Sequence, residues 1–139
     1  MIRIEETKDL DACMKIRTKV FVEEQNVPVE LEHDDADETA THLLATLDDR
    51  PVGTLRILID GDHAKIGRVA VLAEQRGTGL GLALMQAALG TLRQRGDIRE
   101  VGLGAQTHAL GFYERLGFEA YGPEFDDAGI PHRAMKLPL

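Results

Sequence analysis

The stretch from Ile66 to Met85 constrains the fold of this chain more than any other. Its first part, Ile66 to Leu72, is rich in β-branched and apolar residues, which favours a strand. Three glycines follow within residues 77–81, and residues 82–89 are strong helix formers. A strand, a glycine turn and a helix N-terminus leave backbone N–H groups unpaired and direct the positive end of the helix dipole at the turn. The pattern therefore predicts an anion-binding turn.

The identity of the anion is less constrained by the glycines themselves. The turn lacks the Lys-Ser/Thr ending of a nucleotide-hydrolase phosphate loop. A Gly-x-Gly-x-x-Gly dinucleotide fingerprint starting at Gly77 fails as well, because Leu82 stands at the third glycine position. A glycine-rich turn that binds no ligand remains the alternative.

The segment Arg76-x-x-Gly79-x-Gly81, directly after an apolar strand, resembles the acetyl-CoA pyrophosphate loop of the GNAT N-acetyltransferase superfamily. The motif of that superfamily is Gln/Arg-x-x-Gly-x-Gly/Ala. The resemblance implies acetyl-CoA as cosubstrate, with the Val71 N–H placed to hydrogen-bond the thioester carbonyl. The residues it implies for acetyl-CoA binding are Val69, Ala70, Val71, Arg76, Gly77, Thr78, Gly79, Leu80, Gly81, Gln106, Phe112 and Tyr113.

A second motif, Phe-Tyr-x-x-Leu-Gly-Phe at residues 112–118, looks like the GNAT motif that follows this loop. In that superfamily the tyrosine lies close to the CoA sulfur and often acts as general acid, which points to Tyr113. Chemically, a positioned phenol can protonate or hydrogen-bond a departing thiolate. The alternative is an ordinary amphipathic helix in which Phe112 and Tyr113 only pack.

Four further segments resemble the ElaA/YjcF-like branch of the superfamily: residues 21–28, 32–42, 105–106 and 129–132. The glutamate that some GNAT proteins use as base before the loop is absent, since residues 64–72 contain no acid. Histidine is a natural base near neutral pH, and we favour His132, with Glu24 as second choice. Cys13 is expected to be a core residue of the first helix, which makes an acyl-cysteine intermediate unfavoured. The amine is therefore expected to attack acetyl-CoA directly.

Composition limits the remaining classes. The 139 residues favour a single domain over 1–139, and one cysteine excludes an internal disulfide and a Cys-rich zinc site. No metal site is expected. The net charge of −8 argues against nucleic acid and anionic membranes as partners. No apolar stretch is long enough to span a membrane, so a cytoplasmic location is expected. A homodimer is left open.

Residues 23–42 contain eight acids and neither Lys nor Arg. Such a run is usually a solvated loop, and it lacks the Asp-x-Asp-x-Asp-Gly pattern of a calcium loop. The functional interpretation is an acidic wall that attracts an amine. It favours a small, cationic primary amine as the acceptor.

Hydrophobic patterns and turn residues predict seven strands and three helices. The predicted strands cover residues 2–5, 42–47, 52–59, 64–72, 100–105, 118–121 and 133–137. The predicted helices run from Thr7 to Glu24, from the glycine turn to Arg95, and from residue 107 or 108 to 116. This order predicts a mixed α/β or α+β protein with a single sheet. The resemblance implies a GNAT-like form of it, mostly antiparallel and twisted, with helices on both faces.

Three functions are compatible with these patterns. The first is an acetyl-CoA-dependent N-acetyltransferase that acts on a small amine. The second is a non-catalytic acyl-CoA-binding or regulatory domain of the same fold. The third, an NAD- or nucleotide-binding module, is disfavoured by the incomplete loop motifs.

Overall fold

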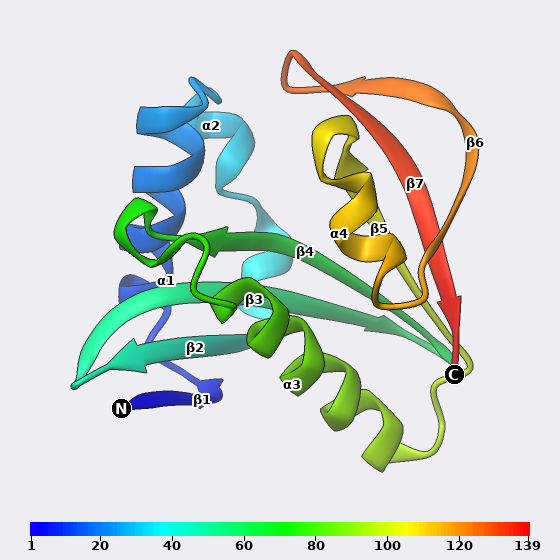
Figure 1. The fold of residues 1–139 in the computed structure, drawn as a ribbon, viewed down its shortest axis with the longest axis horizontal. Coiled ribbons are helices and arrows are strands. Elements are labelled where there is room, and N and C mark those ends of the chain that lie inside the picture. The colour runs from blue at the N-terminus through cyan, green and yellow to red at the C-terminus, as the bar shows by residue number, and fades with distance from the viewer.

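A computed structural model describes residues 1–139, and its centre is one sheet of seven strands (Figure 1). The strands follow the order β1-β2-β3-β4-β5-β7-β6. All neighbouring pairs are antiparallel except β4 and β5, which confirms the mixed, mostly antiparallel sheet. The strand bounds are β1 (Ile2–Thr7), β2 (Thr41–Leu47), β3 (Arg50–Asp60), β4 (His63–Val71), β5 (Glu100–Gln106), β6 (Glu119–Asp127) and β7 (Ile130–Pro138).

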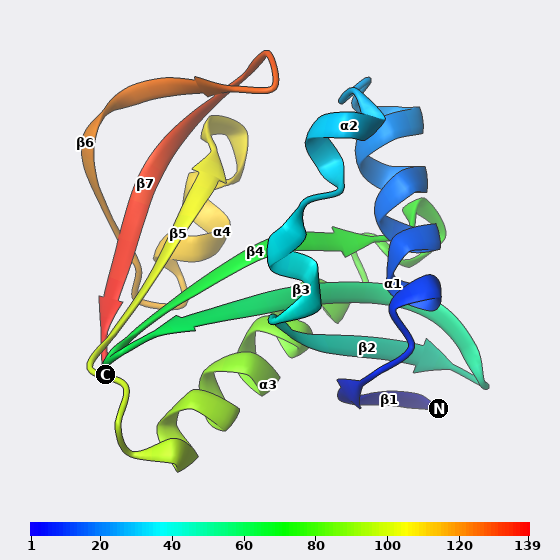
Figure 2. The same cartoon turned by 180° about the vertical axis from the view of Figure 1, so that it is seen from behind.

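Helices cover both faces of the sheet, as expected. Helices α3 (Leu80–Arg95) and α4 (Leu110–Glu114) lie in front of it in Figure 1. Helices α1 (Leu10–Arg17) and α2 (Val29–Glu32) lie on the other face, in front of β3 and β4 in Figure 2. No helix combines the length and the apolar composition needed to cross a membrane.

The main core lies between α3 and the sheet. Leu84, Met85 and Leu92 of α3 are buried together with Ile66 of β4 and Val101 of β5. Each such side chain contributes roughly 1.5–3 kcal/mol through burial, so this layer fixes where α3 begins. Because the glycine turn immediately precedes α3, the core also fixes the position of that turn.

The first helix differs from the prediction. It begins at Leu10, because the Asp9 carboxylate accepts from the Ala12 amide and caps it, whereas the Thr7 hydroxyl only accepts from the Asp9 amide. After Arg17 the chain continues as η1 (Thr18–Glu24), a π-helix, and not as α-helix. π-Helical turns are rare and frequently occur at functional sites. Cys13 is fully buried in a second core cluster, as predicted.

The acidic run is not a solvated loop. It forms α2 and the short 3-10 helix η2 (Asp35–Glu38), and two of its acids, Glu32 and Asp37, are buried. The cause is a set of ion pairs with arginines from other elements, described below.

Two boundaries near the C-terminus also differ. The helix expected over 107–116 is a 3-10 turn, η4 (Thr107–Ala109), followed by five residues of α4. The last two strands are longer than predicted because they pair with each other as a hairpin. Consequently His132 lies inside β7 and not ahead of it.

The strands β4 and β5 separate soon after they begin. Their parallel pairing covers only His63–Lys65 with Glu100–Gly102, and beyond it the strands diverge (Figure 2). On its other edge β4 contains a bulge. Gly67 pairs with Arg56 and Ala70 pairs with Thr54, so β4 has one more residue than β3 between these two pairs. Arg68, in this bulge, has φ +52°. The divergence leaves one edge of β4 unpaired and opens the sheet at its centre.

Candidate functional site

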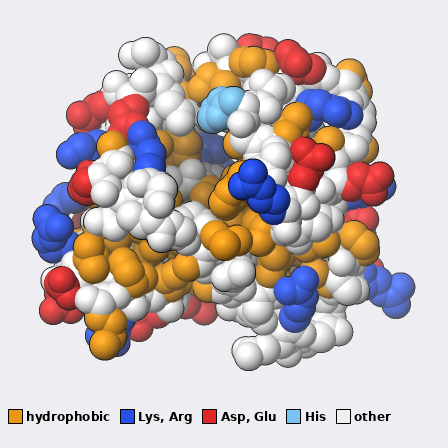
Figure 3. All heavy atoms as spheres, viewed as in Figure 1, with side chains coloured by type: hydrophobic (Ala, Val, Ile, Leu, Met, Phe, Trp, Pro, Cys, Tyr) orange, Lys and Arg blue, Asp and Glu red, His pale blue; other side chains and the backbone are white.

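A cleft of about 620 Å³ occupies the opening between β4 and β5. The space-filling view shows it as a hollow in the middle of the molecule, with hydrophobic side chains in its walls (Figure 3). Both halves of the fold contribute to the lining: η1, α2 and β4 on one side, and β5, α4 and the β6–β7 hairpin on the other. The cleft contains several of the residues singled out in the sequence.

The glycine turn lies at the N-terminus of α3. Gly77 and Gly79 have φ values of +79° and +88°, which explains why glycine is needed there. The amides of Gly77, Thr78 and Gly79 donate to no acceptor within the chain. Gly79 is the N-cap residue of α3 but has no side chain to satisfy the helix amides. The turn therefore presents unpaired donors at the positive end of a helix of 16 residues.

Arg76 and Glu24 are paired with each other. The Arg76 Nη2 lies 2.6 Å from Glu24 Oε1, and Arg76 Nε donates to the Val71 carbonyl at 3.2 Å. Arg76 lines the cleft and Glu24 does not. Glu24 lies outside the cleft lining and is already paired with Arg76, so it is poorly placed to accept a proton from a substrate.

The three residues at the end of β4 face different ways. The Leu72 amide, just after β4, donates to the Val52 carbonyl of β3 at 2.9 Å. Because backbone amides alternate in direction along a strand, the preceding Val71 amide points away from β3 and towards the opening. Val69 and Val71 line the cleft. Ala70 is buried against the α1 cluster, and Leu80 is buried in the main core. Ala70 and Leu80 can therefore contact a ligand only through their backbone atoms.

Tyr113 and Phe112 both line the cleft. The Tyr113 ring lies edge-on to Phe112 and Phe118, with centroid distances of 5.0 and 6.1 Å. Burial among these rings raises the pKa of Tyr113 to about 12. Gly81 faces the same ring system, because a Cβ there would meet Phe112 at 3.6 Å. The hydroxyl of Tyr113 is thus a proton-bearing group at every physiological pH.

His132, in β7, lines the same side of the cleft as Tyr113 and is 9% exposed. Its Nδ1 is 2.7 Å from the Ile130 carbonyl, which can only accept, so Nδ1 donates to it and the lone pair of the neutral imidazole lies on Nε2. Phe125 stacks on the imidazole with a centroid distance of 5.7 Å and fixes its plane. The ring is oriented as a base needs to be, with Nε2 making no hydrogen bond within the chain.

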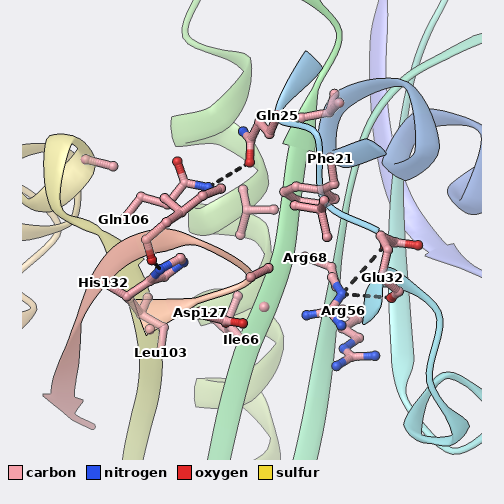
Figure 4. Close-up of a pocket in the computed structure, with 18 of the residues that line it drawn as sticks. Phe21, Gln25, Glu32, Arg56, Ile66, Arg68, Leu103, Gln106, Asp127 and His132 are labelled. Carbon is pink, nitrogen blue, oxygen red and sulfur yellow. Dashed lines mark hydrogen bonds and ion pairs between the residues drawn. The ribbon is translucent and has the colours of Figure 1, made fainter. Parts of the chain in front are cut away.

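Gln106, at the end of β5, connects the two walls (Figure 4). Its Nε2 donates to Gln25 Oε1 at 2.8 Å, and its Oε1 lies 2.6 Å from His108 Nε2. All three residues line the cleft. The sequence motifs did not indicate Gln25 for this role, because its contact with Gln106 joins positions 81 residues apart.

A buried ion cluster adjoins the cleft, and the sequence analysis missed it. Arg17 pairs with Glu32 and, at 2.7 Å, with Asp37. Arg56 binds Asp37 at 2.9 Å and both oxygens of Asp34. Burial opposes ionisation of Asp37, but hydrogen bonds from the two arginines outweigh it and lower its pKa to about 2. Arg17 could have indicated this cluster, because it is the one charged residue on the apolar face of its helix and a buried arginine needs a carboxylate partner.

Asp127, in the β6–β7 hairpin, is the other missed residue. It lines the cleft and forms no ion pair or hydrogen bond through its side chain. The other carboxylate in the lining, Glu32, is occupied by Arg17. Asp127 is therefore the one carboxylate in the cleft that remains available to a cation.

Comparisons with known proteins agree with this geometry. The sequence model of the acetyltransferase (GNAT) domain matches residues 5–139. The uncharacterized N-acetyltransferase YjcF of Bacillus subtilis is 36% identical over 129 residues, 92% of this chain and 91% of YjcF. Protein ElaA of Escherichia coli is 36% identical over 130 residues, 91% of this chain and 85% of ElaA.

Solved structures give the same picture. The crystal structure of Escherichia coli ElaA superposes with a TM-score of 0.88 at 32% identity, covering 98% of this chain and 99% of that one. A Bacillus subtilis acetyltransferase solved in complex with CoA gives a TM-score of 0.76 at 19% identity, covering 100% of this chain and 99% of that chain. The second likeness is one of fold.

Proposed function

Because this chain belongs to the GNAT acetyltransferase family, we propose that it transfers an acetyl group from acetyl-CoA directly to the primary amine of a small acceptor. The observation that supports the proposal is the cleft itself: Tyr113, His132 and Val71 line one opening, and Arg76, which directly precedes the glycine turn, lines it as well.

The glycine turn fits the pyrophosphate of acetyl-CoA. The unpaired amides of Gly77, Thr78 and Gly79 can donate to phosphate oxygens, and the N-terminus of α3 adds its dipole. Arg76 directly precedes these residues, and a phosphate would compete with Glu24 for its guanidinium. The unpaired edge of β4 offers the Val71 amide to a carbonyl oxygen.

Bound acetyl-CoA supplies a thioester carbonyl as the electrophile and a thiolate as the leaving group. Tyr113 keeps its proton up to about pH 12, so its hydroxyl serves as a hydrogen-bond donor. Complete proton transfer to a thiolate is unfavourable, because a thiol has a pKa of about 8.5 and the phenol lies about 3.5 units above it. We therefore assign Tyr113 the stabilisation of negative charge on the sulfur and not its complete protonation.

His132 accepts the proton that the attacking amine must lose. Its Nε2 lone pair is available in the cleft while Nδ1–H is held by the Ile130 carbonyl. Glu24 is the weaker candidate, since it is bound to Arg76 and lies outside the cleft lining.

The buried acids of the run at residues 23–42 are not the groups that attract the acceptor amine. Glu32, Asp34 and Asp37 are neutralised by arginines. Asp127 is the carboxylate in the cleft with no partner, and it can attract the ammonium form of the acceptor, which releases one proton to water before His132 accepts the second as the amine attacks. A cationic amino group remains part of the proposal on that basis.

Two measurements on the purified protein test the proposal. A thermal-shift panel with acetyl-CoA, CoA, NAD and ATP should show the largest rise in melting temperature with the two CoA compounds, because a ligand that binds only the native state stabilises it. Release of free thiol with an amine library should depend on the amine, and mass spectrometry should find the acetylated product. Stabilisation by CoA without any product would favour the non-catalytic acyl-CoA-binding alternative.

A further inference from the structure

The three arginines of the ion cluster are not equally neutralised. Arg17 and Arg56 are buried, with side chains 1% and 8% exposed, and both make close contacts with carboxylates. Arg68 is 25% exposed and lines the cleft. The difference makes Arg68 the member of the cluster that can engage a ligand.

Backbone carbonyls hold the Arg68 guanidinium in place without cancelling its charge. Nε donates to the Glu32 carbonyl and Nη2 to the Leu31 carbonyl, both at 3.2 Å. The nearest carboxylate oxygens, on Asp34 and Glu32, lie at 3.3 and 3.6 Å. Arg56 and Arg17 bind those same carboxylates more closely. Arg68 is therefore oriented but only partly paired, and its Nη1 makes no hydrogen bond.

The surroundings of Arg68 favour an additional anion. Burial lowers the pKa of its guanidinium, and the positive charges of Arg56 and Arg17 lower it further. The carboxylates of Glu32 and Asp34 raise it in turn. A carboxylate at Nη1 would relieve the repulsion among the three arginines and would form a charge-assisted hydrogen bond.

The backbone at Arg68 is strained in a way that serves the cleft. The residue has φ +52° in the β4 bulge, a conformation that a non-glycine residue rarely adopts. A bulge redirects a side chain from the regular alternation of the strand. Figure 4 shows Arg68 beside Glu32, at the wall that faces His132 and Asp127.

We propose that the acceptor is a primary amine that also carries a carboxylate, and that Arg68 is the residue that recognises this carboxylate. The proposal rests on the proposed function and names its substrate class. Arg68 receives the carboxylate through Nη1, since Nη2 already donates to the Leu31 carbonyl and to Asp34, while the amino group lies towards Asp127 and His132. The apolar lining from Phe21, Leu31, Phe125 and Ile130 suits an apolar body between the two charges.

The first test compares matched substrates on the unmodified protein. Phenylalanine and phenethylamine differ only in the carboxylate, as do leucine and isopentylamine. Thiol release with acetyl-CoA should give a kcat/KM at least about tenfold higher for the amino acid of each pair, consistent with a hydrogen bond to a charged group. Equal or better use of the neutral amine would overturn the proposal.

The second test changes the arginine. Arg68→Gln should raise KM for the amino acids by about ten- to a hundredfold and leave KM for the matched amines nearly unchanged. Arg93→Gln, the same change at an exposed position of α3, should alter neither. An equal loss with both substrate types would assign Arg68 a structural role. If Arg68→Gln does not fold, the substrate pairs on the parent protein decide.

A binding measurement separates this proposal from the proposed function. Calorimetry with CoA present should show that N-acetylphenylalanine binds more tightly than its uncharged amide, and that Arg68→Gln removes the difference. If no amine is acetylated but this preference holds, the proposed function fails and the carboxylate site stands. If the acid and the amide bind equally, the carboxylate site fails, whatever the activity.

Discussion

Replacement of Tyr113 by Phe removes one oxygen from the wall of the cleft. The ring stays, so the edge-on contacts with Phe112 and Phe118 should stay as well. The hydroxyl forms no hydrogen bond within the chain, which means that its loss leaves no protein group without a partner. Tyr113→Phe should therefore keep the melting temperature and the affinity for acetyl-CoA.

The expected loss of rate follows from the pKa of about 12. Proton transfer from such a phenol to a thiolate of pKa about 8.5 is uphill by about 3.5 units, or about 5 kcal/mol. The hydroxyl can contribute only a hydrogen bond to a developing charge, worth about 1.5–3 kcal/mol. The corresponding fall in kcat is about ten- to a hundredfold, at the lower end of what a general acid contributes.

Single-turnover thiol release over pH 6 to 10 measures this effect directly. Because Tyr113 remains protonated throughout that range, the ratio of the parent rate to the variant rate should be independent of pH. A ratio that declines towards pH 10 would show that the phenol titrates near its ordinary pKa, and would refute the argument from burial. Equal loss of binding and stability would make Tyr113 a packing residue.

Three other changes test the turn, the base and the ion cluster. Gly79→Val should weaken acetyl-CoA binding in calorimetry at least about tenfold, whereas Gly96→Val, which has a similar positive φ at the other end of α3, should cost similar stability and leave binding intact. His132→Gln should lower kcat by about 10²–10⁴-fold without changing acetyl-CoA affinity, and the exposed His63→Gln should have no effect on kcat. Asp37→Asn should cost about 2 kcal/mol or more in urea unfolding at pH 7, since its pKa falls from 3.8 to about 2 on folding. That difference should shrink as pH falls through 4 towards 2, because the native carboxylate is then protonated; a constant difference would contradict it.

Much of the fold can be predicted because its signals are local. The strand–glycine–helix pattern of residues 66–95 depends on propensities and on φ values that only neighbouring residues set, and Gly79 and Gly96 bound α3 as the sequence indicates. The strands β2 and β3 and the burial of Cys13 follow in the same way. The resemblance to a known family added the proposed roles of Tyr113 and of the glycine turn, which periodicity alone leaves open.

The sequence by itself therefore determined the seven strands, their order, helix α3 and the glycine turn. Only the tertiary structure decided how the charges are used. Glu32 and Asp37 belong to an acidic run in the sequence, but the sheet and α1 bring Arg17 and Arg56 to them from 15 and 19 residues away. The strength of an ion pair depends on distance and burial, and neither is encoded within a short window of residues. For the same reason, the partly paired Arg68 and the unpaired Asp127 emerge only where β4 and β5 diverge.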